Sequence, residues 1–131
     1  MNYQELIALA RTARERAYAP YSGFTVGAAL LCDDGRVFVG CNIENVSYTP
    51  TCCAERVAVF SAVAAGERAF AALAVVGGKG EKAAPLCAPC GVCRQVLREF
   101  CSEELPVVLE GEGGEPVIRT LGQLLPQPFS L

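Results

Sequence analysis

The sequence predicts an α/β fold in which a single mixed β-sheet of about five strands is sandwiched between helices. Short valine-rich runs alternate with longer alanine-rich stretches that have helical spacing. After a first helix, the expected elements follow in the order ββαβαβ, which places helices on both faces of one sheet. The chain of 131 residues, 52% of them hydrophobic, suits one domain over residues 1–131 with a core that needs no disulfides.

The first helix is expected over residues 2–17, with Asn2 as its cap. Its apolar residues recur at helical spacing. Arg11, Arg14 and Arg16 occupy the other face. We therefore expect these three arginines to form a solvated surface.

A β-hairpin is the clearest local element of the sequence. Its strands are expected over residues 24–32 and 37–41, joined by the turn Asp33–Arg36. The polar segment over residues 42–50 is either a functional loop or a plain connector, and its position alone does not separate the two interpretations.

Two helices and three strands complete the expected fold. We expect Thr51 to cap the first of these helices and Gly66 to end it. We expect Val92 on the buried side of the second helix, a flexible loop over residues 77–82, and Thr120 as the cap of a short helical turn near the C-terminus. In chain order, the five elements are expected over residues 52–65, 70–76, 90–101, 106–109 and 117–119.

The composition excludes several classes of protein. The net charge of −3 and the absence of a basic run argue against binding of long nucleic acid. No apolar run reaches the roughly 18–20 residues of a membrane span, and the N-terminus lacks the pattern of a signal peptide. We expect a cytoplasmic protein, in which clustered cysteines are more often metal ligands or catalysts than disulfides.

Two short motifs carry the chemistry. Cys53 and Cys90 each lie at the start of an expected helix, and Cys93 completes a C-x-x-C motif with Cys90. Three thiolates leave the fourth position of a tetrahedral zinc ion open, as in catalytic zinc sites. Glu55 is placed to take a proton from a water molecule there, and Arg56 to temper the negative charge. The chain has no histidine, so a metal site must use cysteine or carboxylate.

Other interpretations of these motifs remain open at this point. If Cys52 or Cys87 were a fourth ligand, the metal site would be closed. A lone C-x-x-C motif also occurs in redox pairs and zinc ribbons. Arg56 also fits an ordinary surface charge. The combination of C-A-E with a later P-C-x-x-C is nevertheless specific, because it prescribes ligands, acid and order together. The cysteines that fit small core positions are Cys32, Cys41 and Cys101.

The combination matches the three-cysteine form of the zinc-deaminase signature. The segments Tyr21–Ala29, Asn42–Asn45, Cys53–Arg56 and Pro89–Gln95 extend the match. With them, nearly the whole chain resembles the small homotetrameric cytidine deaminases. The resemblance implies a three-layer α/β/α fold and hydrolytic deamination of cytidine and deoxycytidine to uridine and deoxyuridine, with release of ammonia, in pyrimidine salvage.

The resemblance also implies roles for individual residues at the reaction centre. Cys53, Cys90 and Cys93 would bind one zinc ion per chain. Glu55 would carry protons between the attacking water, N3 of the base and the leaving amino group. Arg56 would hydrogen-bond the cysteine thiolates and tune the metal.

For the substrate, the resemblance implies that Asn42 and Glu44 bind the 3′-hydroxyl of the ribose. Phe24 would pack near the base and sugar, and the backbone of Ala54 and of the residues before Pro89 would read the edge of the pyrimidine. Related deaminases of other cytosine compounds, such as the blasticidin-type enzymes, differ around the sugar, and Asn42 with Glu44 favours a nucleoside. A non-catalytic zinc-stabilised protein would have no use for an acid at the position of Glu55.

The resemblance finally implies a homotetramer whose sites are shared between subunits. Tyr48 and Phe129 would then reach the site of a neighbouring subunit. Val46 stands where alanine is common in the family, and Cys52 adds a thiol next to a ligand. A polynucleotide substrate is not expected, because the chain is short, acidic and lacks a basic channel.

Overall fold

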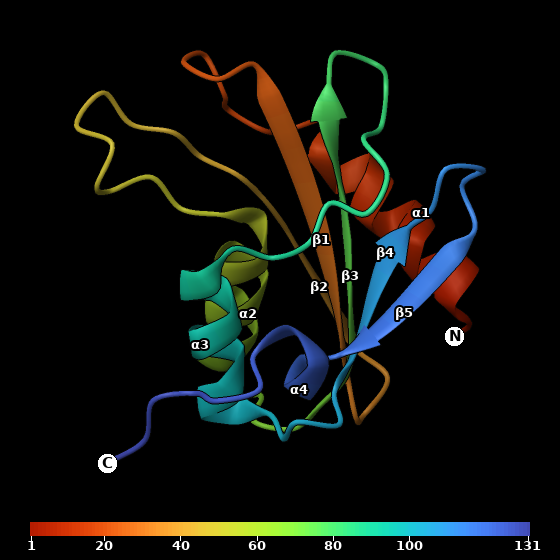
Figure 1. Cartoon of the computed structure of the whole chain (residues 1–131), viewed down its shortest axis with the longest axis vertical. Helices are drawn as coiled ribbons and strands as arrows, with labels where there is room; N and C mark the ends of the chain where they lie inside the picture. The colour runs from red at the N-terminus through yellow and green to blue at the C-terminus, as the bar shows by residue number, and fades with distance from the viewer.

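The computed structural model describes residues 1–131, which form four helices and one five-stranded sheet. The strand order is β2-β1-β3-β4-β5, and only the pair β3–β4 is parallel. Figure 1 shows how the chain crosses this sheet. The elements are α1 Tyr3–Arg14, β1 Phe24–Cys32, β2 Val37–Cys41, α2 Ala54–Ala64, β3 Phe70–Lys79, α3 Gly91–Phe100, β4 Pro106–Glu110, β5 Pro116–Thr120 and α4 Leu121–Leu124.

The sheet lies between two helical layers, as the sequence predicts. Helix α1 covers one face, and α2, α3 and α4 cover the other (Figure 1). Each face has its own apolar core. The core under α1 is the smaller and includes Leu6, Ile7 and Val76, whereas the larger core under α2 and α3 includes Leu30 and Leu97. The predicted fold class, a mixed sheet sandwiched between helices, is confirmed.

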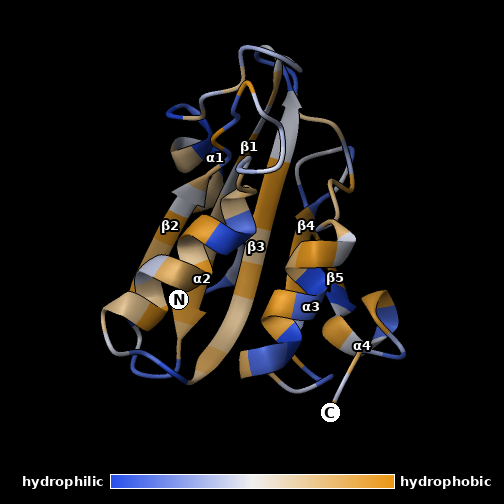
Figure 2. Ribbon diagram, turned by 90° about the vertical axis from the view of Figure 1, so that its left-hand side faces the viewer, coloured by the Kyte–Doolittle hydropathy of each residue, from blue (hydrophilic) through white to orange (hydrophobic).

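The topology brings the beginnings of α2 and α3 together. Helix α2 follows the hairpin β1–β2, and α3 is the crossover between the parallel strands β3 and β4. Figure 2 shows both helices on the same face, in front of the apolar strands at the centre of the sheet. Chain segments about 40 residues apart in the sequence therefore meet at one end of this layer.

Three expectations about the elements were wrong. Strand β3 continues through Gly77, Gly78 and Lys79, because the long strand β1 pairs with all three where a loop was expected. Helix α2 begins after Cys53 rather than after Thr51, whose hydroxyl accepts a hydrogen bond from the backbone of the preceding loop. Val92 is 58% exposed, because α3 turns that side away from the sheet.

The arginines of the first helix do not form one solvated surface. Arg14 is only 8% exposed and is hydrogen-bonded to three backbone carbonyls, while Arg11 forms an ion pair with the buried carboxylate of Glu110. Arg11, whose side chain is half accessible, and Arg16 are exposed as expected. The expected solvated surface was wrong for Arg14, because the helix packs against β1 on the side that carries this residue.

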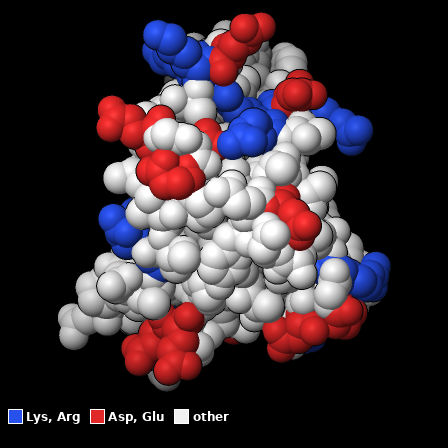
Figure 3. Space-filling model, turned by 90° about the vertical axis from the view of Figure 1, so that its right-hand side faces the viewer, with Lys and Arg blue, Asp and Glu red and all other residues white.

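The surface carries both signs of charge. On the face shown in Figure 3, lysines and arginines lie beside aspartates and glutamates, and no continuous basic band crosses it. None of the helices combines the length and the apolar character needed to cross a membrane.

Candidate metal and substrate site

Two helix starts bring three thiols together. Cys53 precedes the first residue of α2, and Cys90 precedes the first residue of α3; both have extended backbone, and neither side chain caps its own helix. Cys93 lies in the first turn of α3 and is fully buried. The Sγ atom of Cys90 is 3.7 Å from that of Cys53 and 3.6 Å from that of Cys93.

The spacing of the sulfur atoms fits a zinc ion. Four ligands in a tetrahedron with Zn–S bonds of about 2.3 Å place neighbouring sulfurs about 3.8 Å apart. The three Sγ atoms lie within 4.8 Å of one another, and the group includes neither Cys52 nor Cys87. The structure therefore favours three protein ligands with an open fourth position over a closed structural site.

Arg56 lies beside the thiols. Its Nη2 donates to the Sγ of Cys53 and to the carbonyl of Thr51, both at 3.4 Å. The pKa of Cys53 is lowered to about 5, first by a hydrogen bond from the thiol of Cys93 and then by Arg56. In turn, the hydrogen bond to Cys53 raises the pKa of Arg56. The guanidinium thus stabilises negative charge on the sulfurs, as the sequence-based expectation requires.

Glu55 is a buried acid in the first turn of α2. Only 4% of the residue is exposed. Burial raises the pKa of its carboxyl to about 7, against an opposing hydrogen bond from its own backbone. An acid with a pKa near neutrality can both take and give a proton at physiological pH, which is what general acid–base catalysis needs.

A cavity of about 270 Å³ lies beside the thiols of Cys53 and Cys90 and the carboxyl group of Glu55. This volume lies just below the range of about 300–1,000 Å³ for ligand pockets, so the cavity suits a small molecule. It includes five of the predicted substrate and catalytic positions and two of the three predicted metal ligands. Its lining residues are Ser22, Phe24, Val26, Asn42, Glu44, Thr51, Cys53, Ala54, Glu55, Cys87, Ala88 and Cys90.

Two polar side chains of the cavity, Asn42 and Glu44, are held firmly by hydrogen bonds. Asn42 is 9% exposed; its Oδ1 accepts from the backbone N–H of Val26 and its Nδ2 donates to the carbonyl of Phe24, both at 2.8 Å. Glu44 accepts from the hydroxyl of Ser22 at 2.5 Å and from two backbone N–H groups. The hydroxyl of Ser22 lowers the pKa of Glu44, so this carboxylate is ionised at neutral pH.

Comparison with known proteins identifies this arrangement. Residues 1–109 match the family model described as "Cytidine and deoxycytidylate deaminase zinc-binding region". The chain belongs to this deaminase family. The chain is 51% identical to a cytidine deaminase of Sporosarcina psychrophila over 130 residues, which are 99% of this chain and 93% of that protein.

Solved structures agree with this family membership. A crystal structure of cytidine deaminase from Burkholderia pseudomallei has a TM-score of 0.89 and 53% identity, covering 98% of this chain and 100% of that one. A crystal structure of cytidine deaminase from Mycobacterium tuberculosis has a TM-score of 0.82 and 45% identity, covering 100% of this chain and 99% of that one. The deaminase fold is therefore shared over the full length.

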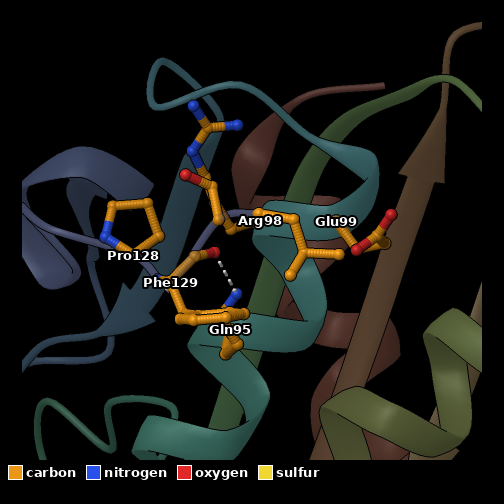
Figure 4. Close-up of a pocket in the computed structure, with 7 residues that line it drawn as sticks. Gln95, Arg98, Glu99, Pro128 and Phe129 are labelled. Carbon is orange, nitrogen blue, oxygen red and sulfur yellow. Dashed lines mark hydrogen bonds between the residues drawn. The ribbon is translucent and has the colours of Figure 1, made fainter.

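Two residues that the family resemblance assigns to the substrate lie outside the cavity. Tyr48 is 71% exposed and packs edge-to-face on Tyr21, with ring centroids 6.1 Å apart. Phe129 is 73% exposed, and its carbonyl accepts a hydrogen bond from Nε2 of Gln95 (Figure 4). The backbone N–H of Phe129 donates to Oε1 of the same side chain. Within one chain of the deaminase, neither side chain lines the cavity.

The sequence-based reasoning did not assign Ser22, Val26 or Thr51 to the cavity, although all three line it. Cys87 and Ala88, the residues before Pro89, form one side of it. Burial raises the pKa of Cys87 to about 11, so it contributes a neutral thiol rather than a further thiolate. Ser22 and Val26 lie within the segment Tyr21–Ala29 that carries the family resemblance, which was the signal for them in the sequence.

Proposed function

We propose that the protein catalyses the zinc-dependent hydrolytic deamination of cytidine and deoxycytidine to uridine and deoxyuridine, with release of ammonia, in pyrimidine salvage. The single observation that carries the proposal is the buried carboxyl of Glu55 beside three thiols at a cavity large enough for a nucleoside. A structural metal site has no use for a buried acid with a pKa near 7. Relatives that are called cytidine deaminases, at 51% and 48% identity, support the same activity.

The three thiols fit a zinc ion, and Cys53, Cys90 and Cys93 would hold it. When bound, zinc supplies Lewis-acid activation of a water molecule at neutral pH. Glu55 accepts a proton from the attacking water and delivers it to N3 of cytosine as the C4–O bond forms. Glu55 then takes the remaining proton of the new C4 hydroxyl and transfers it to the exocyclic nitrogen, the C4–N bond breaks as the C4 carbonyl forms, and ammonia leaves. Atoms balance with one water consumed and one ammonia released.

The remaining residues of the cavity position the nucleoside. Asn42 uses one N–H and one lone pair for strand β1, so one amide hydrogen is left for the 3′-hydroxyl of the sugar. The ionised Glu44 accepts from the same hydroxyl. Phe24 covers the ring system, and the backbone of Ala54, at the start of α2, hydrogen-bonds the edge of the pyrimidine.

The test is ammonia release from cytidine and deoxycytidine by the purified protein. We expect release that stops with a zinc chelator and returns with added zinc. Cytosine and a blasticidin-type nucleoside serve as matched comparison substrates, because they share the base chemistry and differ at the sugar. Release that is insensitive to the chelator, or no release from protein containing one zinc per chain, would overturn the proposal.

We also propose that the enzyme is a cytoplasmic homotetramer with shared sites. The exposed side chains of Tyr48 and Phe129, which do not reach the cavity of their own chain, support this assembly. All eight cysteines are free, which suits a reducing compartment. Light scattering should give a mass of four chains. Substitution of Tyr48 by Ala should raise the KM for cytidine if the residue reaches a neighbouring site, and an unchanged KM would contradict that role.

A further inference from the structure

Arg14 is a buried arginine on the face of the sheet opposite the thiols. Only 8% of it is exposed, yet no carboxylate pairs with it. Its Nε donates to the carbonyl and to the hydroxyl of Thr25, both at 3.0 Å. Its Nη2 donates to the carbonyls of Gly80 at 2.8 Å and Lys82 at 3.0 Å. One planar side chain therefore holds two segments that lie far apart in the sequence.

The close packing of α1 on β1 places the guanidinium there. At Gly27 a Cβ atom would lie 2.0 Å from the carbonyl oxygen of Ala10 and 2.5 Å from the backbone nitrogen of Arg14, so helix and strand touch through their backbones. The side chain of Arg14 then extends along the sheet to Thr25, near the end of β3. Burial of an unpaired cation is costly, and four neutral acceptors compensate for the lost solvation.

The two segments that Arg14 holds continue into two sides of the substrate cavity. We call Phe24 and Val26 the strand side and Cys87 and Ala88 the loop side. Thr25 lies between the two residues of the strand side. Gly80 and Lys82 begin the loop that leads to the loop side.

The loop itself is folded back tightly on β3. A Cβ atom at Gly78 would lie 2.0 Å from the carbonyl oxygen of Lys82. The amide of Ala84 donates to Gly77 at 2.6 Å, and the amide of Leu86 donates to the carbonyl of Glu110 at 2.9 Å. Lys82 is thus joined to the loop side of the cavity by a short stretch whose backbone is hydrogen-bonded to β3 and β4.

We infer that Arg14 is a positioning residue that sets the distance between the strand side and the loop side of the substrate cavity. The guanidinium fork binds Thr25 with one nitrogen and the loop with another, so it acts as a fixed spacer. Lysine cannot reproduce this, because a single ammonium group lacks the planar fork. The kinetic consequence rests on the proposed deaminase function, whereas the structural consequence does not.

The first test compares Arg14→Gln, Arg14→Lys and the exposed control Arg16→Gln. We expect Arg14→Gln to retain one zinc per chain and to raise the KM for cytidine about tenfold with a much smaller change in kcat, because a misplaced cavity side weakens binding. Arg14→Lys should raise the KM less than Arg14→Gln but still above the wild-type value. Arg16→Gln should leave the KM unchanged. A lower melting temperature with an unchanged KM would reduce Arg14 to a structural residue and overturn the inference.

The second test measures amide hydrogen exchange over residues 80–88 and needs no activity. We expect faster exchange at Ala84 and Leu86 in Arg14→Gln than in wild type, with α3 unchanged. If Arg14→Gln does not fold, Thr25→Val removes one acceptor and should give the same changes at smaller size. Unchanged exchange overturns the inference. If the wild-type protein releases no ammonia, the proposed function is wrong. The amide hydrogen exchange of residues 80–88 then still tests whether Arg14 positions the loop.

Discussion

The four helices of this protein begin in two different ways. Helices α1 and α4 each begin with a capping box: Asn2 pairs with Glu5, and Thr120 pairs with Gln123, through reciprocal backbone–side-chain hydrogen bonds. Helices α2 and α3 begin at Cys53 and Cys90, and neither has a side-chain cap. The same unpaired N–H groups exist at every helix start.

The difference shows how one physical feature serves two purposes. At α1 and α4, the side chains satisfy the free amides, which stabilises the helix. At α2 and α3, a cysteine occupies the position before the first helical residue without capping it. The positive end of a helix dipole favours the thiolate form of such a cysteine, which is the form that binds metal. Helices α2 and α3 therefore lack the stabilisation of a side-chain cap at the two places where the metal-binding thiols lie.

The largest effect on metal binding and activity is expected when the cysteine at the start of α3 is replaced by a capping residue. Cys90→Ser supplies a hydroxyl that can cap α3 and removes a sulfur ligand. We expect zinc to fall well below one per chain and deamination to be lost, because two thiols do not hold the ion firmly. Metal analysis measures the zinc content, and ammonia release measures the deamination. Full zinc occupancy in this variant would show that another thiol, such as Cys87, completes the site.

A substitution at Glu55 should also have a large effect, and it separates proton transfer from metal binding at the start of α2. Glu55→Gln keeps the shape of the side chain and removes the acid. We expect kcat to fall about 10³-fold while zinc stays at one per chain, since general acid–base catalysis contributes on this scale. Single-turnover kinetics and metal analysis check it. Activity near that of wild type would contradict the role of Glu55.

A smaller effect is expected at the residue that supports the thiols. Arg56→Gln removes the charge beside Cys53, and we expect zinc affinity or activity to fall about 10- to 100-fold. Arg68→Gln is the matched control, because Arg68 binds only backbone carbonyls at the end of α2. Competition with a zinc chelator measures the affinity. Equal zinc affinity and equal activity in Arg56→Gln and wild type would count against the tuning role.

The smallest effect on activity is expected at a capped start. Asn2→Ala removes the capping box of α1 and should lower the free energy of unfolding by about 1 kcal/mol, without changing zinc content or kcat. Urea denaturation measures the loss. A change in metal binding would show that the two kinds of helix start are not separate in function.

Much of the fold and of the site could be predicted from the sequence, because the signals are local. The hairpin strands end where predicted, at residues 24–32 and 37–41, since a polar turn separates two apolar runs. Cys53, Cys90 and Cys93 were identified by spacing at two helix starts, and the structure brings their sulfurs together. Fold class and deaminase family are confirmed by the structure and the comparisons.

The remaining features depend on contacts between distant segments, which no local pattern contains. Strand β3 is lengthened through two glycines by pairing with β1, although glycines predict a loop. Arg14 is buried because the carbonyls of Gly80 and Lys82 come to it from the far end of that strand.

The separation of the thiols along the chain has a consequence for the unfolded state. Cys53 and Cys93 are about 40 residues apart. A metal ion held by both ties the chain into a ring of that size, as a disulfide bond would. Closing such a ring removes conformational entropy from the unfolded chain that corresponds to roughly 4 kcal/mol. In a protein whose cysteines are all free, a metal ion bound by Cys53 and Cys93 would therefore also be a reversible cross-link between the starts of α2 and α3.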